Sequence, residues 1–254
     1  MNVNNQNCKL KIAHRGVPSL APENTMISFK RAIEFNIDVL EIDIHRTIDG
    51  ELVVIHDPTT NRTSQEKGVI NKLTYETLTK YDVGKWKGQA YIGEQIPLFQ
   101  DVLKLIKDTH IKLLIEIKQP ENYPNIESDI IAMIKQHDIS YNQIMIQSFN
   151  RNSIQKISTL LPDIELGVLI KKKNRFISKR AIKKIEEYAN YINPNYKIVT
   201  RKFVEAAHAS QLKVLPYTIN NKSTAQKMLA MGVDGLISDY AHLLDEWMKS
   251  SIIK

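Results

Sequence analysis

The chain has 254 residues, of which 43% are hydrophobic, and a formal net charge of +7 at pH 7. This apolar content excludes a disordered chain and is enough for the core of one large α/β domain. The single cysteine, Cys8, excludes an internal disulfide framework and a cysteine-based zinc cluster. The excess of basic residues favours anionic ligands without identifying one.

The first seven residues are polar and lack the basic-then-apolar order of a signal peptide. No apolar run approaches the ~20 residues that span a bilayer. We therefore expect a soluble, cytoplasmic protein that forms a single domain over residues 1–254.

Short apolar segments alternate with amphipathic helical patterns along most of the chain. Strands are predicted at residues 9–13, 38–44, 112–117, 143–148, 164–169, 189–193, 212–218 and 235–238. Helical patterns lie between most of them, among them residues 23–36, 126–137, 150–161 and 222–231. This alternation predicts an α/β fold, a (β/α)8 TIM barrel with a parallel sheet and outer helices.

A ninth apolar segment, residues 51–55, does not fit the barrel count. Only seven residues separate Ile44 from Leu52, which is too few for a parallel crossover, and Asp49-Gly50 is a hairpin-turn signal. We therefore expect this strand to pair antiparallel with the second strand. Residues 58–97 then form an insertion after this hairpin, a small lobe or lid over the barrel mouth.

The C-terminal segment, residues 241–253, places its apolar residues on one helical stripe. The pattern predicts a closing helix packed on the barrel. A helix lying on a membrane surface is the alternative.

Charged side chains interrupt the apolar strands near their carboxyl ends. Glu41 and Asp43 are two residues apart, so their side chains point the same way, and Glu116 lies in the next barrel strand. Adjacent carboxylates repel unless a positive charge lies between them, and Mg²⁺ or Ca²⁺ is the natural partner of carboxylate oxygens. We expect these three residues to bind one divalent cation. An ion-pair ladder with neighbouring Lys or Arg is the alternative.

Two histidines, His14 and His56, each follow an apolar strand beside this carboxylate cluster. Histidine exchanges protons near neutral pH, so we expect this pair to be catalytic. Asp57 either orients His56 or is an ordinary turn residue before Pro58. His45 could also face the site, but we assign it no catalytic role.

Arg15 and Lys118 add positive charge at the same rim. Arginine suits bidentate phosphate binding, and lysine neutralises phosphate charge. Together with a metal and two imidazoles, they indicate phosphoryl transfer without a covalent protein intermediate.

The chain resembles the glycerophosphodiester phosphodiesterase family over nearly its whole length. The resemblance is carried by His14-Arg15-Gly16, Pro22-Glu23-Asn24-Thr25, Glu41-Ile42-Asp43, Asp49-Gly50, His56-Asp57, Ile96-Pro97-Leu98, Ile115-Glu116-Ile117-Lys118, Gln147-Ser148-Phe149 and Gly232-Val233-Asp234-Gly235.

This resemblance implies a TIM barrel that hydrolyses glycerophosphodiesters, such as glycerophosphocholine or glycerophosphoethanolamine, to glycerol 3-phosphate and an alcohol. It implies an acid/base pair (His14, His56), ligands for Mg²⁺ or Ca²⁺ (Glu41, Asp43, Glu116), phosphate-binding residues (Arg15, Lys118) and a supporting role for Glu23. Where the family often has Trp-Thr-Val-Asn, this chain has Tyr217-Thr218-Ile219-Asn220. Tyr217 retains an aromatic wall, and with Trp86 it is expected to line the substrate pocket.

Two chemical routes fit this set of residues. In one, a histidine deprotonates the glycerol 2-hydroxyl while the other protonates the leaving alcohol, and water then opens a cyclic phosphate. In the other, metal-bound water attacks the phosphate directly.

Rival functions are a phospholipase D-like barrel acting on lysophospholipids or sphingolipids, and a non-catalytic module that binds phosphate metabolites. Nucleic-acid binding is disfavoured because basic charge is not accompanied by a recognised motif. A basic segment, Lys171-Lys172-Lys173-Asn174-Arg175 with Lys179-Arg180, is interpreted as a solvated loop and helix start. Transient contact with an anionic membrane, or with polymeric glycerol phosphate, is its alternative.

Overall fold

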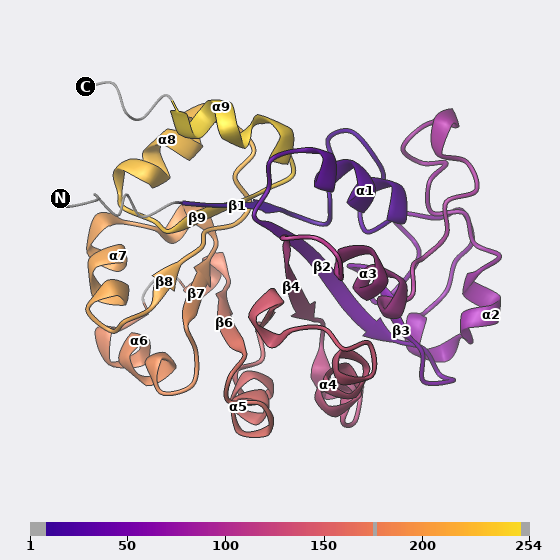
Figure 1. Ribbon diagram of the computed structural model, residues 1–254, viewed down its shortest axis with the longest axis horizontal. Coiled ribbons are helices and arrows are strands. Elements are labelled where there is room, and N and C mark those ends of the chain that lie inside the picture. Colours follow the sequence, from indigo (N-terminus) through magenta and orange to yellow (C-terminus); the bar gives the residue numbers. More distant parts are fainter. Residues whose placement is uncertain (1–8, 175–176, 250–254) are drawn as a thin grey trace.

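The computed structural model describes residues 9–174 and 177–249, and its centre is a parallel barrel (Figure 1). Neighbouring strands follow the order β8-β7-β6-β5-β4-β2-β1-β9. Their bounds are β1 (Leu10–Ala13), β2 (Val39–Arg46), β4 (Lys112–Ile117), β5 (Ile144–Ser148), β6 (Glu165–Ile170), β7 (Tyr191–Pro194), β8 (Lys213–Val214) and β9 (Gly235–Ser238). The predicted TIM barrel is confirmed.

The barrel is nearly closed, and its seam lies between β8 and β9. Single backbone hydrogen bonds cross this seam: Asp234 N–H donates to Val214 O at 2.9 Å and Ile219 N–H to Ile237 O at 2.8 Å. The strand predicted at residues 212–218 is shorter in the structure, where β8 ends at Val214. Pro216 has no N–H to donate toward β9, so no continuous ladder forms here.

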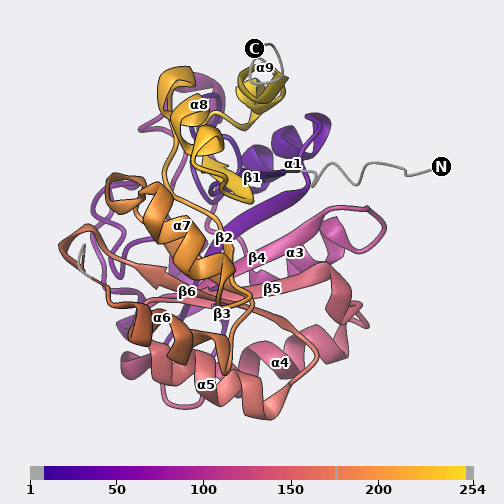
Figure 2. The same cartoon turned by 90° about the vertical axis from the view of Figure 1, so that its left-hand side faces the viewer.

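Helices cover the outside of the barrel, and Figure 2 shows α4, α5 and α6 along the side formed by β4, β5 and β6. Their starts follow local capping: α1 begins after Thr25, whose side chain accepts from Ser28 N–H, and α5 begins after Asn150. The barrel helices are α1 (Met26–Glu34), α3 (Phe99–Ile106), α4 (Ile126–Gln136), α5 (Arg151–Leu160), α6 (Lys179–Glu186), α7 (Arg201–His208), α8 (Lys222–Ala230) and α9 (Leu244–Lys249).

Two apolar clusters lie on the two faces of the barrel wall. The larger fills the space between strands and helices and includes Leu40 and Ile42. Because side chains alternate along a strand, Glu41 and Asp43 lie on the opposite, inner face, beyond Val39 toward the carboxyl end of β2. The smaller, inner cluster consists of Ile12, Val39, Leu114, Met145, Tyr191, Leu215 and Ile237. One end of the barrel interior is therefore apolar, and the other carries charged groups.

The extra strand β3 (Leu52–Val54) pairs antiparallel with β2, as predicted. The insertion that follows forms a lobe beside β3 and α1, at the right of Figure 1. It contains α2 (Tyr75–Leu78) and short 3-10 turns at Ile70–Lys72 and Gln89–Tyr91. Its own apolar cluster, shared with β3, consists of Val53, Ile55, Ile70, Leu78, Val83 and Ile96.

The C-terminal helix α9 packs on the barrel through Leu244 and Trp247, which are 0% and 5% exposed. This agrees with the predicted closing helix as far as Lys249; the remaining predicted residues, 250–253, lie outside the described ranges. Over residues 9–174 and 177–249, no helix has the length and apolar character needed to cross a membrane.

Candidate active site

Three buried carboxylates meet at the carboxyl ends of β2 and β4. Asp43 pairs in register with Glu116, and one oxygen from each of Glu41, Asp43 and Glu116 lies within 4.8 Å of the others. These residues are 1%, 0% and 6% exposed. The Oδ1 atom of Asp43 is buried and accepts no hydrogen bond from the described residues. Three carboxylates this close, one of which has an oxygen without a hydrogen bond, fit a hard divalent cation.

The electrostatics of this cluster are unfavourable without added positive charge. Burial, together with the charges of Asp43 and Glu116, raises the pKa of Glu41 well above its usual value. Burial would also raise the pKa of Asp43, but the nearby charges of Arg15 and Lys118 outweigh burial and hold that pKa far below its usual range. A cation at the cluster would allow all three groups to be charged.

Arg15 and Lys118 already contact these carboxylates. Arg15 Nε lies 3.1 Å from Asp43 Oδ2, and Lys118 Nζ lies 2.6 Å from Glu116 Oε1 and 3.4 Å from Asp43 Oδ1. Part of the alternative ion-pair ladder is therefore present. It does not extend to Glu41, which accepts from the Arg15 backbone N–H at 2.9 Å but has no ion pair with a described cationic side chain.

Each histidine has a carboxylate partner for its Nδ1 atom. His14, directly after β1, lies 2.6 Å from Asp239 Oδ1, and His56 lies 2.6 Å from Asp57 Oδ1. When Nδ1 carries the proton, the carboxylate fixes that tautomer and leaves Nε2 as the atom that exchanges protons. Asp239 directly follows β9, and no role was predicted for it from the sequence.

A polar network supports the site from behind. Glu23 Oε1 lies 2.9 Å from Arg15 NH1, and Glu23 Oε2 lies 2.6 Å from Arg62 NH1. Arg62 Nε lies 2.7 Å from Asp57 Oδ2, so Arg62 connects the supports of Arg15 and His56. Burial alone would raise the pKa of Glu23, but its hydrogen bond to Arg62 and the charge of Arg15 lower it.

Amide side chains complete the floor of the site, and no role was predicted for them either. Asn24 Nδ2 donates to Asp43 Oδ2 at 2.8 Å. Gln147, next to Glu116 in register, donates to Glu41 Oε1 at 3.4 Å and accepts from Asn193 Nδ2 at 2.7 Å. These contacts orient the carboxylates and leave Asp43 Oδ1 without a hydrogen bond, with Lys118 Nζ 3.4 Å away.

His45 lies behind His56. Its ring contacts the hydroxyl of Tyr123 at 2.7 Å and the backbone oxygen of His56 at 3.1 Å. Burial lowers the pKa of His45 to about 4. It is neutral near pH 7 and acts as a support of the His56 backbone.

A small cavity of about 120 Å³ is lined by His14, His56, Arg15, Lys118, Glu41 and Glu116. Tyr217 lines this cavity, as expected of a pocket residue, and its hydroxyl donates to Ile170 O at 3.1 Å. Trp86 is not among the residues that line it: the indole N–H donates to Val83 O at 2.8 Å, and the side chain lies on the lobe, 44% exposed.

A larger groove of about 650 Å³ adjoins this cavity. Lys171, the first residue of the basic segment, lines the groove, whereas Lys172 and Lys173 begin an exposed 3-10 turn. Arg175 lies outside the described residues.

Comparison with known proteins places these features in one family. The model of the glycerophosphoryl diester phosphodiesterase family matches residues 14–243. YhdW of Bacillus subtilis (strain 168) is similar to this chain, with 37% identity over 229 residues that cover 90% of this chain and 93% of that protein. The glycerophosphodiester phosphodiesterase of Caldanaerobacter subterraneus subsp. tengcongensis is 36% identical over 231 residues, which cover 91% of this chain and 93% of that protein.

A solved structure is similar in both fold and sequence. It is an Oleispira antarctica phosphodiesterase in complex with the product sn-glycerol-3-phosphate. The two proteins superpose with a TM-score of 0.86 and share 29% identity over 94% of this chain and 96% of that chain.

Proposed function

Because the chain belongs to the glycerophosphoryl diester phosphodiesterase family, we propose that it hydrolyses glycerophosphodiesters to glycerol 3-phosphate and an alcohol, with one divalent cation, Mg²⁺ or Ca²⁺. The observation that carries this proposal is the pairing of each histidine with an aspartate beside the carboxylate cluster. His14 and His56 lie 2.6 Å from Asp239 and Asp57, respectively.

Glu41, Asp43 and Glu116 would hold the cation, since one oxygen of each lies within 4.8 Å of the others. When bound, the cation supplies Lewis-acid chemistry and neutralises charge at the phosphate. Arg15 and Lys118 bind oxygens of the phosphate, because both side chains line the small cavity.

The two histidines then move the protons at their Nε2 atoms. One takes the proton of the glycerol 2-hydroxyl as its oxygen attacks phosphorus, and the other gives a proton to the leaving alcohol oxygen. In the second step water opens the cyclic phosphate, and each histidine performs the opposite transfer. Asp57 and Asp239 stabilise the protonated rings, as each carboxylate faces an Nδ1 atom.

The test is release of glycerol 3-phosphate from glycerophosphocholine and glycerophosphoethanolamine in Mg²⁺, in Ca²⁺ and after chelation. We expect metal-dependent release that His14→Ala and His56→Ala each abolish. No release from folded, metal-loaded protein with any glycerophosphodiester would refute the proposal.

A diester without the neighbouring hydroxyl distinguishes the two routes. The cyclic route requires that hydroxyl, so we expect this analogue to be resistant. Hydrolysis of the analogue at the rate of the natural diester would instead support direct attack by water.

A further inference from the structure

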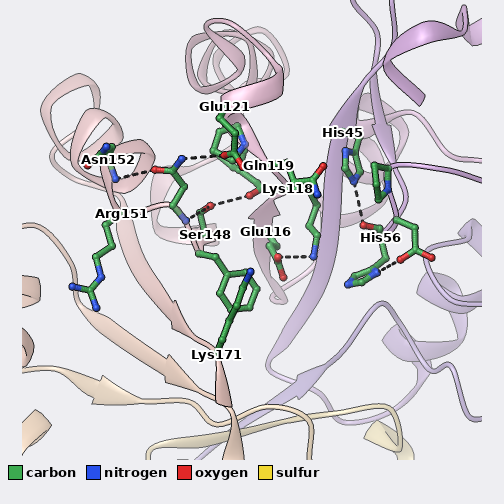
Figure 3. A pocket seen from close by; sticks show the side chains of 16 residues that line it. His45, His56, Glu116, Lys118, Gln119, Glu121, Ser148, Arg151, Asn152 and Lys171 are labelled. Atoms are coloured by element: carbon green, nitrogen blue, oxygen red, sulfur yellow. Dashed lines mark hydrogen bonds and ion pairs between the residues drawn. The ribbon is translucent and has the colours of Figure 1, made fainter. Parts of the chain in front are cut away.

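The groove beside the catalytic cavity is continuous with it. His56, Glu116, Lys118 and Phe149 line both spaces, whereas His14 lines only the smaller one. Figure 3 shows the Glu116–Lys118 pair in the middle of the groove, with His56 on one side and Arg151 and Lys171 on the other. A substituent that leaves the phosphate on the His56 side therefore enters this groove.

The groove carries two cationic side chains, Arg151 and Lys171, that form no ion pair with a described residue. Asp57, Glu116 and Lys118 line it but are already paired within the site. Arg151 and Lys171, on the far side, form no ion pair with any residue in the described ranges. Arg151 is the first residue of α5, and Lys171 directly follows β6, so both lie at the barrel mouth.

One acidic group faces these cations, but it is already hydrogen-bonded. Glu121 Oε2 accepts from Asn150 Nδ2 at 3.1 Å. Two unpaired cations against one carboxylate leave the outer part of the groove with net positive charge.

The aromatic surface in the groove is also occupied. Lys171 Nζ lies 4.7 Å from the centre of the Phe149 ring, a cation–π arrangement. A quaternary ammonium group binds best to such a ring face, so choline would have to displace the Lys171 ammonium and remain beside its charge.

We propose that this groove receives the leaving alcohol and selects alcohols that carry an anionic group, a carboxylate or a phosphate, over choline. The inference rests on the proposed function, because the groove matters only as part of a site that cleaves diesters. Arg151 and Lys171 are the residues that contact the anionic group, and Lys171 on Phe149 disfavours the cationic one.

The test compares pairs of diesters that differ by one anionic group. Glycerophosphoserine against glycerophosphoethanolamine isolates a carboxylate, and glycerophosphoinositol 4-phosphate against glycerophosphoinositol isolates a phosphate. The readout is kcat/KM for glycerol 3-phosphate release at low ionic strength. We expect the anionic member of at least one pair to be preferred by about fivefold, the size expected for partly exposed charge pairs. High salt should reduce this preference because it screens exposed charges.

Variants assign the preference to the groove. Lys171→Met retains an apolar contact with Phe149 and removes the charge, and we expect it to lose most of the preference and to raise kcat/KM for glycerophosphocholine about twofold. Arg151→Gln tests the second cation. Lys172→Met, a neighbouring exposed lysine that does not line the groove, should change neither value.

The outcomes are distinct. If no diester yields glycerol 3-phosphate, the proposed function fails. If diesters are cleaved but both pairs differ by less than twofold, the groove inference alone fails. It fails also if Lys171→Met has the same effect as Lys172→Met on kcat/KM for the anionic and the cationic substrates.

Discussion

Asp239→Asn is the substitution that tests most directly how the site organises its histidines. Asp239 Oδ1 lies 2.6 Å from His14 Nδ1, and its Oδ2 accepts from Asn220 Nδ2 at 2.5 Å. The substitution retains shape but removes the charge that stabilises a protonated His14 ring. A hydrogen bond to a charged group contributes about 1.5–3 kcal/mol. Since 1.4 kcal/mol corresponds to tenfold, we expect kcat to fall by about 10- to 100-fold.

The assay measures kcat and KM for glycerol 3-phosphate release between pH 5 and pH 9 with saturating metal. KM should change little, since Asp239 does not line the small cavity in which we propose that the phosphate binds. The matched control is Asp234→Asn at the opposite end of β9, where the carboxylate lies 2.8 Å from His208 Nε2. A change in kcat of less than twofold, or an equal loss in the control per folded molecule, would refute the reasoning.

Three further outcomes follow from the geometry. Burial lowers the pKa of His56 while the hydrogen bond to Asp57 raises it, so Asp57→Asn should shift the His56-controlled limb of the pH–rate profile to lower pH; an unchanged or alkaline-shifted limb would count against this. Chelation should abolish turnover and lower the thermal unfolding temperature. Restoring Mg²⁺ to 100 times its Kd should raise the free energy of unfolding by about 2.7 kcal/mol, measured by calorimetry. Full activity in chelator would contradict the cation site. Leu103→Ala on α3, at a fully buried position, should cost about 2–5 kcal/mol in urea denaturation, while the exposed neighbour Lys104→Ala stays within about 0.5 kcal/mol; similar losses in both would contradict the packing argument.

The sequence was sufficient to predict the barrel and the residues grouped at its centre. Alternation along a strand places Glu41 and Asp43 on one face, and parallel strands bring their carboxyl ends to one edge, where Glu116 and both histidines also lie. These rules depend only on spacing within one segment and on the direction of the strands. The antiparallel β3 was predictable for the same reason, since its connection is too short for a crossover.

Contacts that depend on which distant segments meet were not predictable in this way. Asp239 reaches His14 only because β9 lies beside β1, and Gln147 acquires its role from its register with Glu116. Neither fact is encoded in local periodicity. The end of β8 depends on Pro216 at the seam, and the position of Trp86 depends on side-chain packing inside the lobe.

Arg62, a residue of the lobe, connects the lobe to the supports of Arg15 and His56. Its guanidinium joins Glu23, which holds Arg15, to Asp57, which holds His56. Such coupling is reciprocal. If a bound phosphate favours the ordered arrangement of Arg15 and His56, it also favours the lobe packed against the barrel. Detachment of the lobe then weakens phosphate binding by the same factor. Product bound in the barrel should therefore slow hydrogen exchange and proteolytic cleavage in residues 58–97, a region that contributes no residue to the carboxylate cluster.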